Sequence, residues 1–376
     1  MIILLSLFYF FYFAIVGVYV IFMPKTLVSL GYSAQDIGIV FSATPLIRFI
    51  LPMFFIKGIK INSKIFNIAL IALMIGAISF YFFIYNFYLL LFSDIMLGIG
   101  LSIVIPYIET LSLTNIGKEH YGRVRLFGSL GFVLVALLLV RILVDEKMVL
   151  NFLISLAFIT VVVSYFLVML FDKEDNKRGE KISIESSPFR DYKFWLGLTL
   201  MQVSFGSFYN FFTIYETAHK ISMQITIYLW SFGVLAEIVM LYFQGELLKK
   251  NLLVLLQITL FITAFRWVLV FLFPENIPIL YFSQSLHAFS FALFHSAAIS
   301  YLYELYTNKQ LAQQFFLGFT YGLGGLIGSL LSGFIYENYP EYLFLSSAII
   351  AFTAFISVTL YKKEKEKLLD KKFMTC

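Results

Sequence analysis

The stretch PYIETLSLTNIGKEHYGRVRLFGSLGF, from Pro106 to Phe132, begins inside one long apolar run and ends inside the next. It carries a carboxylate, Glu109, and two arginines, Arg123 and Arg125, around a short basic loop. Ionisable groups at membrane depth cost free energy to insert, so they are usually paired and usually functional. The stretch therefore predicts a membrane protein with a charged site between two successive helices.

The composition of the whole chain indicates the same class. Its 376 residues are 61% hydrophobic and 13% charged, with a mean hydropathy of +0.90. A soluble domain carries about 25% charged residues. Apolar runs near the ~20 residues that cross a bilayer recur along the chain, and in lipid such runs satisfy their backbone hydrogen bonds as helices. We predict twelve spans, at 2–23, 34–56, 65–85, 87–113, 125–144, 149–171, 192–217, 223–245, 251–273, 277–304, 311–336 and 341–361.

The distribution of positive charge predicts the orientation of these spans. Most of the 27 Lys and Arg residues fall on one side of the membrane if the N-terminus is cytoplasmic. An even number of helices then returns the basic C-terminal tail to the cytoplasm. The net charge of +5 is explained by these loops and does not indicate a nucleic-acid partner. The first run lacks a basic leader and a cleavage site, so we interpret it as a retained helix.

A single polar linker divides the predicted helices into two sets of six. It runs over 172–193, and similar short segments recur on either side of it, as in transporters with parallel repeats. We therefore expect an N-terminal six-helix bundle at 1–171, a cytoplasmic linker at 172–193, a C-terminal bundle at 194–361 and a cytoplasmic basic tail at 362–376.

Of the ionisable side chains within the predicted spans, we single out those expected at membrane depth: Asp36, Arg48, Asp94, Glu109, Arg125, Glu216, Glu237, Arg266, His287 and His295. Near a helix end, a long side chain can reach the interface, and this structural role is an equal alternative for Asp36, Arg48 and Glu216. His287 either carries a proton or is a satisfied hydrogen-bond partner, and His295 is better explained as structural. No third ligand stands at useful spacing from these histidines, so we expect no metal site.

At this point several motifs resemble a known family, the major facilitator superfamily. PYIET followed by YGRVRLFGSLGF is the most specific match, and GFIYEN at Gly333–Asn338 is a second. Both resemble the branch that holds lactose permease and the phenylpropionic acid transporters. The resemblance extends over nearly the whole chain. It implies an all-α integral membrane protein with 12 transmembrane helices in two six-helix bundles.

The same resemblance implies roles for individual residues. Glu109 and Arg125 match residues that bind substrate, and Phe132 matches an aromatic residue that stacks on it. Arg266 and His287 match residues of the proton-coupling network, to which we add Glu237 from its similar placement in related symporters. Arg123 is expected at the end of the loop, with a role in topology or gating.

The chain also departs from the lactose permease pattern. Ser290 replaces the glutamate three residues after the helix-ten histidine, and Tyr321 stands where a lysine is usual. The motif in the loop after the second helix is degenerate, with Ile59 near the expected aspartate. Sugar specificity and the lactose-type proton site therefore do not follow from the resemblance.

These features together predict a secondary transporter of a small polar or anionic solute. We expect alternating access and proton symport in the inner membrane of a bacterium, by a monomer without cofactors. An aromatic acid such as phenylpropionate is favoured, and a sugar or nucleoside is the alternative. No catalytic pattern or phosphate-binding loop indicates an enzyme or ATP use. A different class stays open: a receptor or assembly factor that keeps a transporter fold without transport.

Overall fold

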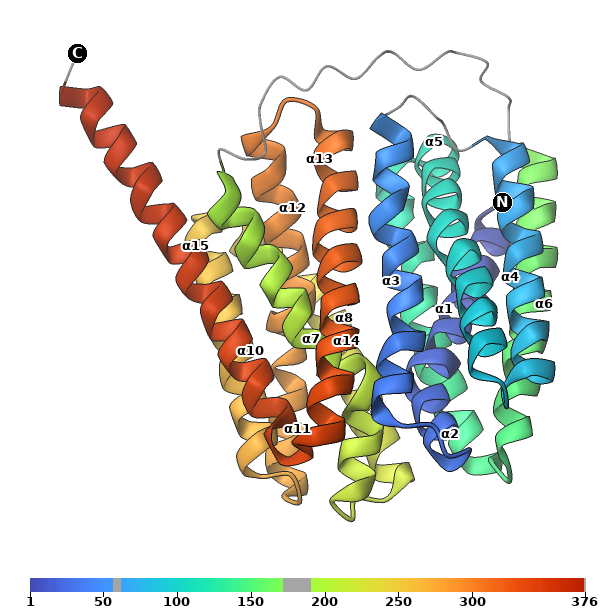
Figure 1. Cartoon of the computed structure of the whole chain (residues 1–376). Helices are drawn as coiled ribbons and strands as arrows, with labels where there is room; N and C mark the ends of the chain where they lie inside the picture. Colours follow the sequence, from blue (N-terminus) through green and yellow to red (C-terminus); the bar gives the residue numbers. More distant parts are fainter. Residues whose placement is uncertain (57–61, 172–190, 375–376) are drawn as a thin grey trace.

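The computed structural model describes residues 1–56, 62–171 and 191–374, and the regular elements among them are all helical. Figure 1 shows two groups of helices side by side, with α1 to α6 in one and α7 to α15 in the other. This confirms the predicted all-α fold of two bundles. The first bundle contains α1 (Ile2–Gly17), η1 (Val18–Phe22), α2 (Met23–Ser29), α3 (Ala34–Ile56), α4 (Ser63–Phe83), α5 (Phe87–Ile142) and α6 (Glu146–Phe171).

The second bundle contains more elements because several of its helices are interrupted. They are α7 (Tyr192–Ala218), α8 (Met223–Phe243), α9 (Gly245–Leu248), α10 (Leu252–Leu272), α11 (Ile277–Ser285), η3 (Ala288–Leu293), α12 (Phe294–Leu305), α13 (Lys309–Phe315), η4 (Phe316–Leu323), α14 (Gly324–Asn338), η5 (Pro340–Tyr342) and α15 (Leu343–Met374). Three of the interruptions in the chain, η1, η3 and η4, are π-helical turns, which occur often at functional sites.

Side-chain caps and one glycine decide where several helices begin and end. Six helices start after an Asn or Ser whose oxygen accepts the backbone N–H three residues later; these are Asn62, Asn86, Ser222, Asn251, Asn276 and Asn308. Gly117, with φ 70° and ψ 170°, divides α5 into spans at 87–117 and 120–142. The connection is thus shorter than predicted, and Arg123 lies inside the second span rather than at the end of a loop.

Eleven stretches of the described chain are long and apolar enough to cross a membrane, and α7 completes the predicted set of twelve. α7 is more polar than the other spans, and its polar side chains are buried against protein. They are Gln202, Ser204, Ser207, Asn210 and Glu216. In the 18-residue apolar window of each of the eleven stretches only 33–56% of the residues are buried, so much of their apolar surface faces outward. That is the pattern of a multi-pass membrane protein, in which lipid covers the outer face.

The two bundles meet along several pairs of elements. α3 packs against α14 and η4, and α5 packs against α8. A Cβ atom added at Gly38 of α3 would lie 2.7 Å from the Ser329 carbonyl oxygen and 3.0 Å from Gly333 Cα in α14. Nearby, the Ala34 N–H of α3 donates to Glu337 Oε2 over 2.7 Å. Close backbone approach and a polar contact therefore join the bundles here.

α15 is longer than the predicted twelfth span. It continues as helix through most of the segment predicted as a tail, and Figure 1 shows it projecting past the other helices. Asp191, before α7, accepts hydrogen bonds from Tyr361 over 3.0 Å and Tyr306 over 3.2 Å, and lies 3.2 Å from the Lys365 Nζ atom. Burial raises the pKa of Tyr306 to about 12, so its hydroxyl remains a donor at physiological pH. Most of the predicted linker, 172–190, and Ile59 lie outside the described residues, and the domain boundaries stay a prediction.

Candidate functional site

The predicted pair in the first bundle is formed, and α1 contributes to it. Arg125 Nε lies 3.7 Å from Glu109 Oε1, and the Tyr121 hydroxyl donates to the same oxygen over 2.9 Å. The Arg125 guanidinium carbon lies 4.1 Å from the ring centre of Phe13 and 5.7 Å from that of Tyr9. We call these five residues the first cluster. Its ion pair is about one third exposed, at 35% for Arg125 and 29% for Glu109.

Phe132 lies at the seam between the bundles rather than in the first cluster. Its ring centre is 6.3 Å from that of Trp230 in α8, at an angle of 52°. Trp230 is fixed by a hydrogen bond from its indole N–H to Thr213 Oγ1 over 3.1 Å. Two aromatic rings from different bundles thus face each other.

The three predicted coupling residues come together in the second bundle. Arg266 of α10 donates through Nη1 to His287 Nδ1 over 2.9 Å and to Ser290 Oγ over 3.1 Å, and through Nη2 to Gln284 Oε1 over 2.8 Å. On the far side of the imidazole ring, His287 Nε2 lies 3.8 Å from Glu237 Oε2. We call these five residues the second cluster.

Arg266 is held in an aromatic cage and is fully buried. Its guanidinium carbon lies 4.4 Å from the ring centre of Trp267, 4.5 Å from that of Phe208 and 5.8 Å from that of Phe205. Desolvated cation–π contacts of this kind contribute about 2 kcal/mol. Within the described residues no carboxylate oxygen lies within 4.0 Å of Arg266, so its hydrogen bonds go to neutral acceptors.

The hydrogen bond from Arg266 fixes the tautomer of His287. Arginine only donates, so Nδ1 must be the accepting nitrogen and the ring proton of neutral His287 must sit on Nε2. That N–H points toward Glu237. A second proton on Nδ1 would place two donors against each other, so the contact with Arg266 favours neutral His287.

The remaining ionisable residues divide into structural and unassigned groups. Asp36 and Ser33 exchange hydrogen bonds of 3.2 Å and 3.1 Å as a cap on α3. His295 Nδ1 lies 2.7 Å from the Tyr321 hydroxyl, in agreement with a structural role. Glu216 does not reach an interface: it is fully buried, and neither carboxylate oxygen has a hydrogen-bond partner in the described residues. Asp94 is also fully buried.

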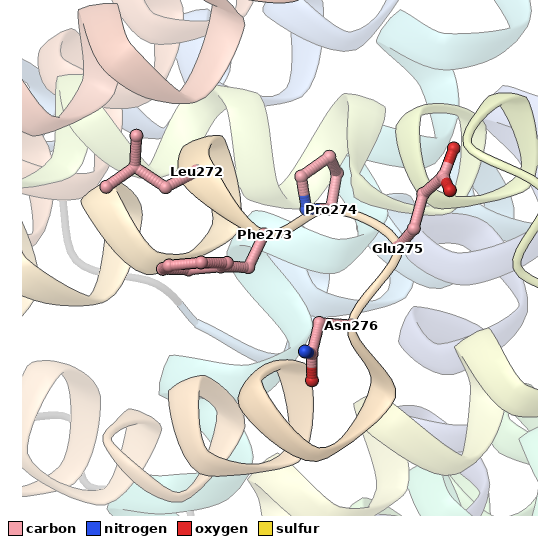
Figure 2. A pocket seen from close by; sticks show the side chains of 5 residues that line it. All are labelled: Leu272, Phe273, Pro274, Glu275 and Asn276. Atoms are coloured by element: carbon pink, nitrogen blue, oxygen red, sulfur yellow. The ribbon is translucent and has the colours of Figure 1, made fainter.

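The described residues include no group of three His, Cys, Asp or Glu that could hold a metal ion. Figure 2 shows a surface hollow at the turn between α10 and α11, lined by Leu272, Phe273, Pro274, Glu275 and Asn276. Its one acidic side chain, Glu275, lies 3.8 Å from Lys220, and both are exposed. The hollow therefore shares no residue with either cluster.

Sequence reasoning missed the aromatic partners of both arginines. Tyr9 and Phe13 lie against Arg125 and Tyr121 donates to Glu109, whereas Phe205, Phe208 and Trp267 surround Arg266. In a chain that is 19% aromatic, an individual ring gives no distinct signal. Tyr9 and Phe13 stood in the first apolar run and Tyr121 in YGRVRLFGSLGF, but none of the three was singled out.

Comparison with known proteins agrees with this architecture. The sequence matches the MFS_1 like family over residues 2–346. A relative from Escherichia coli (strain K12) described as "Probable 3-phenylpropionic acid transporter" is 25% identical over 370 residues, which cover 93% of this chain and 95% of the relative.

Solved structures share the fold at low identity. The nucleoside transporter NupG superposes with a TM-score of 0.77 at 16% identity, covering 96% of this chain and 99% of that one. An auto inhibited POT family peptide transporter superposes with a TM-score of 0.75 at 10% identity, covering 96% of both chains. The chain therefore belongs to the MFS_1 like family and is a multi-pass membrane transporter of the major facilitator type, not an enzyme.

Proposed function

We propose that this transporter moves a small organic anion by alternating access with proton symport, and that an aromatic acid such as phenylpropionate is its substrate. The name of the relative from Escherichia coli supports this substrate class. The two clusters support a division of labour, with recognition in the first and coupling in the second.

The observation that carries the proposal is the state of Arg125. Its guanidinium is partly exposed and lies over the Phe13 ring, yet it donates no hydrogen bond among the described residues. A planar guanidinium with free donors binds a carboxylate through two parallel hydrogen bonds. Glu109, held by Tyr121, keeps Arg125 in place until the substrate carboxylate arrives.

The aromatic part of the substrate has a matching surface at the seam. Phe132 and Trp230 come from different bundles and have ring centres 6.3 Å apart. A flat ring beside them would contact both bundles at once and gain about 0.5–1.5 kcal/mol per aromatic pair beyond area burial. Substrate binding would in this way favour a conformation in which the bundles are closed around it.

For proton coupling we assign the proton to Glu237, with His287 and Arg266 positioning it. The Arg266 hydrogen bond holds His287 neutral, so the imidazole presents an N–H to Glu237 in every turnover state that keeps this contact. The positive charge of Arg125 lies on α5, which packs against α8, the helix of Glu237, across the seam. A substrate carboxylate on Arg125 would offset that charge and favour protonation of Glu237, which links substrate binding to proton binding.

The cellular setting belongs to the same proposal. We place the protein in the inner membrane of a bacterium as a monomer, with both termini in the cytoplasm, because the positive residues follow that orientation. Crosslinking tests the monomeric state, and labelling of Cys376 from either side of sealed vesicles tests the position of the C-terminus.

The direct test is transport by purified protein in liposomes with an imposed inward proton gradient. Labelled 3-phenylpropionate, a nucleoside and a disaccharide are offered separately, and uptake and internal pH are recorded together. We expect 3-phenylpropionate to accumulate while the interior of the liposomes acidifies. Collapse of the proton gradient should abolish this accumulation.

Other outcomes would redirect the proposal. If only the nucleoside or the disaccharide accumulates, the proposed substrate class is wrong, but the proposed transport function stands. Binding of a ligand without accumulation in any vesicle would favour a receptor. Accumulation without any change of internal pH would contradict proton symport.

A further inference from the structure

Asp94, on α5, is a deeply buried carboxyl that neither cluster uses. Its side chain is fully buried. The Tyr19 hydroxyl from η1 donates to Oδ1 over 2.5 Å, and the Thr44 hydroxyl from α3 lies 3.4 Å from Oδ2. Three elements of the first bundle therefore meet at this carboxyl.

Asp94 forms no ion pair with a described residue. Within the described residues no Lys, Arg or His nitrogen lies within 4.0 Å of it. The charged groups on α3 are Asp36, which caps the helix, and Arg48, and on α4 Lys64; neither Arg48 nor Lys64 forms an ion pair with Asp94 in the described residues. From α4 the neighbour of Tyr19 is Phe80, with ring centres 6.5 Å apart. Burying an ionised carboxylate without a partner costs several kcal/mol, so this arrangement favours the neutral, protonated carboxyl.

The chemistry of its partners lets Asp94 change protonation state. A hydroxyl can donate to a carboxylate or accept from a protonated carboxyl, whereas a guanidinium can only donate. Tyr19 and Thr44 can therefore remain bonded in both states. A carboxyl tied to an arginine lacks this freedom.

The position of Asp94 connects it to the elements that move. α3 packs against α14 and η4 of the second bundle, and η1 packs against α7. One turn after Asp94, a Cβ atom added at Gly98 would lie 2.7 Å from Thr44 Oγ1, so α5 and α3 touch here. A change of charge at Asp94 acts directly on two elements that face the other bundle.

From these observations we infer that Asp94, with Tyr19 and Thr44, is a second proton-binding site, in the first bundle. Its ligand is a proton, and the site is separate from Glu237. The proton-binding inference stands on the geometry of this cluster, whereas its part in coupling rests on the proposed function.

Infrared spectroscopy of the purified protein tests proton binding without any substrate. Spectra recorded from acid to alkaline pH are compared between wild type and Asp94→Asn, which keeps the shape and the acceptor for Tyr19. We expect the wild type to show a protonated-carboxyl C=O band that Asp94→Asn lacks. Glu275→Gln, at an exposed surface carboxyl, serves as the control and should leave that band unchanged. Identical spectra for wild type and Asp94→Asn would overturn the inference.

A second variant keeps the test decisive if Asp94→Asn does not fold. Tyr19→Phe removes the hydrogen bond to Oδ1 and should move the C=O band to higher frequency, because a hydrogen bond to a carbonyl lowers its stretching frequency. A band at the wild-type frequency would show that the carboxyl observed is not Asp94.

Transport by the same proteins then tests the coupling role. In Asp94→Asn we expect substrate exchange without a gradient to continue, while proton-driven accumulation falls to the equilibrium distribution. Wild-type accumulation by Asp94→Asn would remove Asp94 from coupling. If the wild type itself moves no protons, the proposed symport fails, and the infrared result alone still decides whether Asp94 binds a proton.

Discussion

The two charged clusters use the same residue types in opposite environments. In the first, Arg125 and Glu109 are about one third exposed and meet at 3.7 Å. In the second, Arg266 is fully buried, donates to three neutral acceptors and meets no carboxylate in the described part of the chain. A partly exposed pair with free donors suits a ligand that comes and goes, whereas a buried arginine held by three acceptors and an aromatic cage suits a fixed scaffold for a proton carrier.

Among the substitutions that separate the two clusters, Glu237→Gln is expected to have the largest effect. Glutamine keeps the size and the polar contact of Glu237 but cannot exchange a proton, so we expect accumulation against a gradient to disappear completely. Exchange of substrate between equal pools should continue, because recognition lies in the other cluster. Counterflow and gradient-driven uptake in the same liposomes measure the two activities, and loss of both would contradict the division of labour.

Arg125→Ala should weaken substrate binding about 100-fold, or ~3 kcal/mol, through the loss of a charged bidentate contact. Arg123→Ala is the matched control, because Arg123 is exposed on the same helix, and it should change the apparent KM by less than about twofold. Equilibrium binding or KM for uptake reports the difference. Equal effects of both substitutions would indicate a general electrostatic role rather than a binding site.

Ser290→Glu tests whether the second cluster can be rebuilt around a different carboxylate. Ser290 Oγ already accepts from Arg266, so a glutamate there would stand beside the guanidinium. We expect the double variant Glu237→Gln, Ser290→Glu to recover part of the accumulation that Glu237→Gln loses. Ser290→Gln in the same background is the control, and recovery by it would exclude proton transfer as the cause.

The smallest effect is expected for Tyr121→Phe, which removes one hydrogen bond to Glu109. A loss of about 1 kcal/mol corresponds to an increase in KM of about fivefold, with the maximal rate nearly unchanged. Steady-state uptake kinetics measure both values. A large fall in the maximal rate with constant KM would indicate that Tyr121 acts in the conformational cycle rather than in substrate recognition.

The long apolar runs made the helices predictable, because membrane helices need both length and hydrophobicity. What the runs did not predict was backbone detail. Gly117 alone separates two spans, so the region between 113 and 125 is mostly helix rather than loop. The π-helical turns depend on the packing of neighbouring helices and leave no pattern in the sequence.

The candidate site was predictable to the extent that charge is rare in a membrane. Glu109 with Arg125, and Arg266 with His287, stood out for that reason and do lie together. Glu216 was ambiguous because sequence position near a helix end does not distinguish an interfacial carboxyl from a buried one. The hydrogen bonds from Arg266 to Gln284 and Ser290 could not be predicted, because they depend on the relative rotation of two helices, which only the folded structure provides.

The π-helical turns have one further consequence, which concerns amide exchange with solvent. Each π-helical turn contains one more residue than an α-helical turn. Its backbone hydrogen bonds join residues five apart rather than four apart, and they open more easily. Val18–Phe22, Ala288–Leu293 and Phe316–Leu323 thus form three short windows within otherwise protected helices. Deuterium incorporated there during turnover would record the bending of these helices as the bundles move, residue by residue, while the flanking α-helical amides stay protonated.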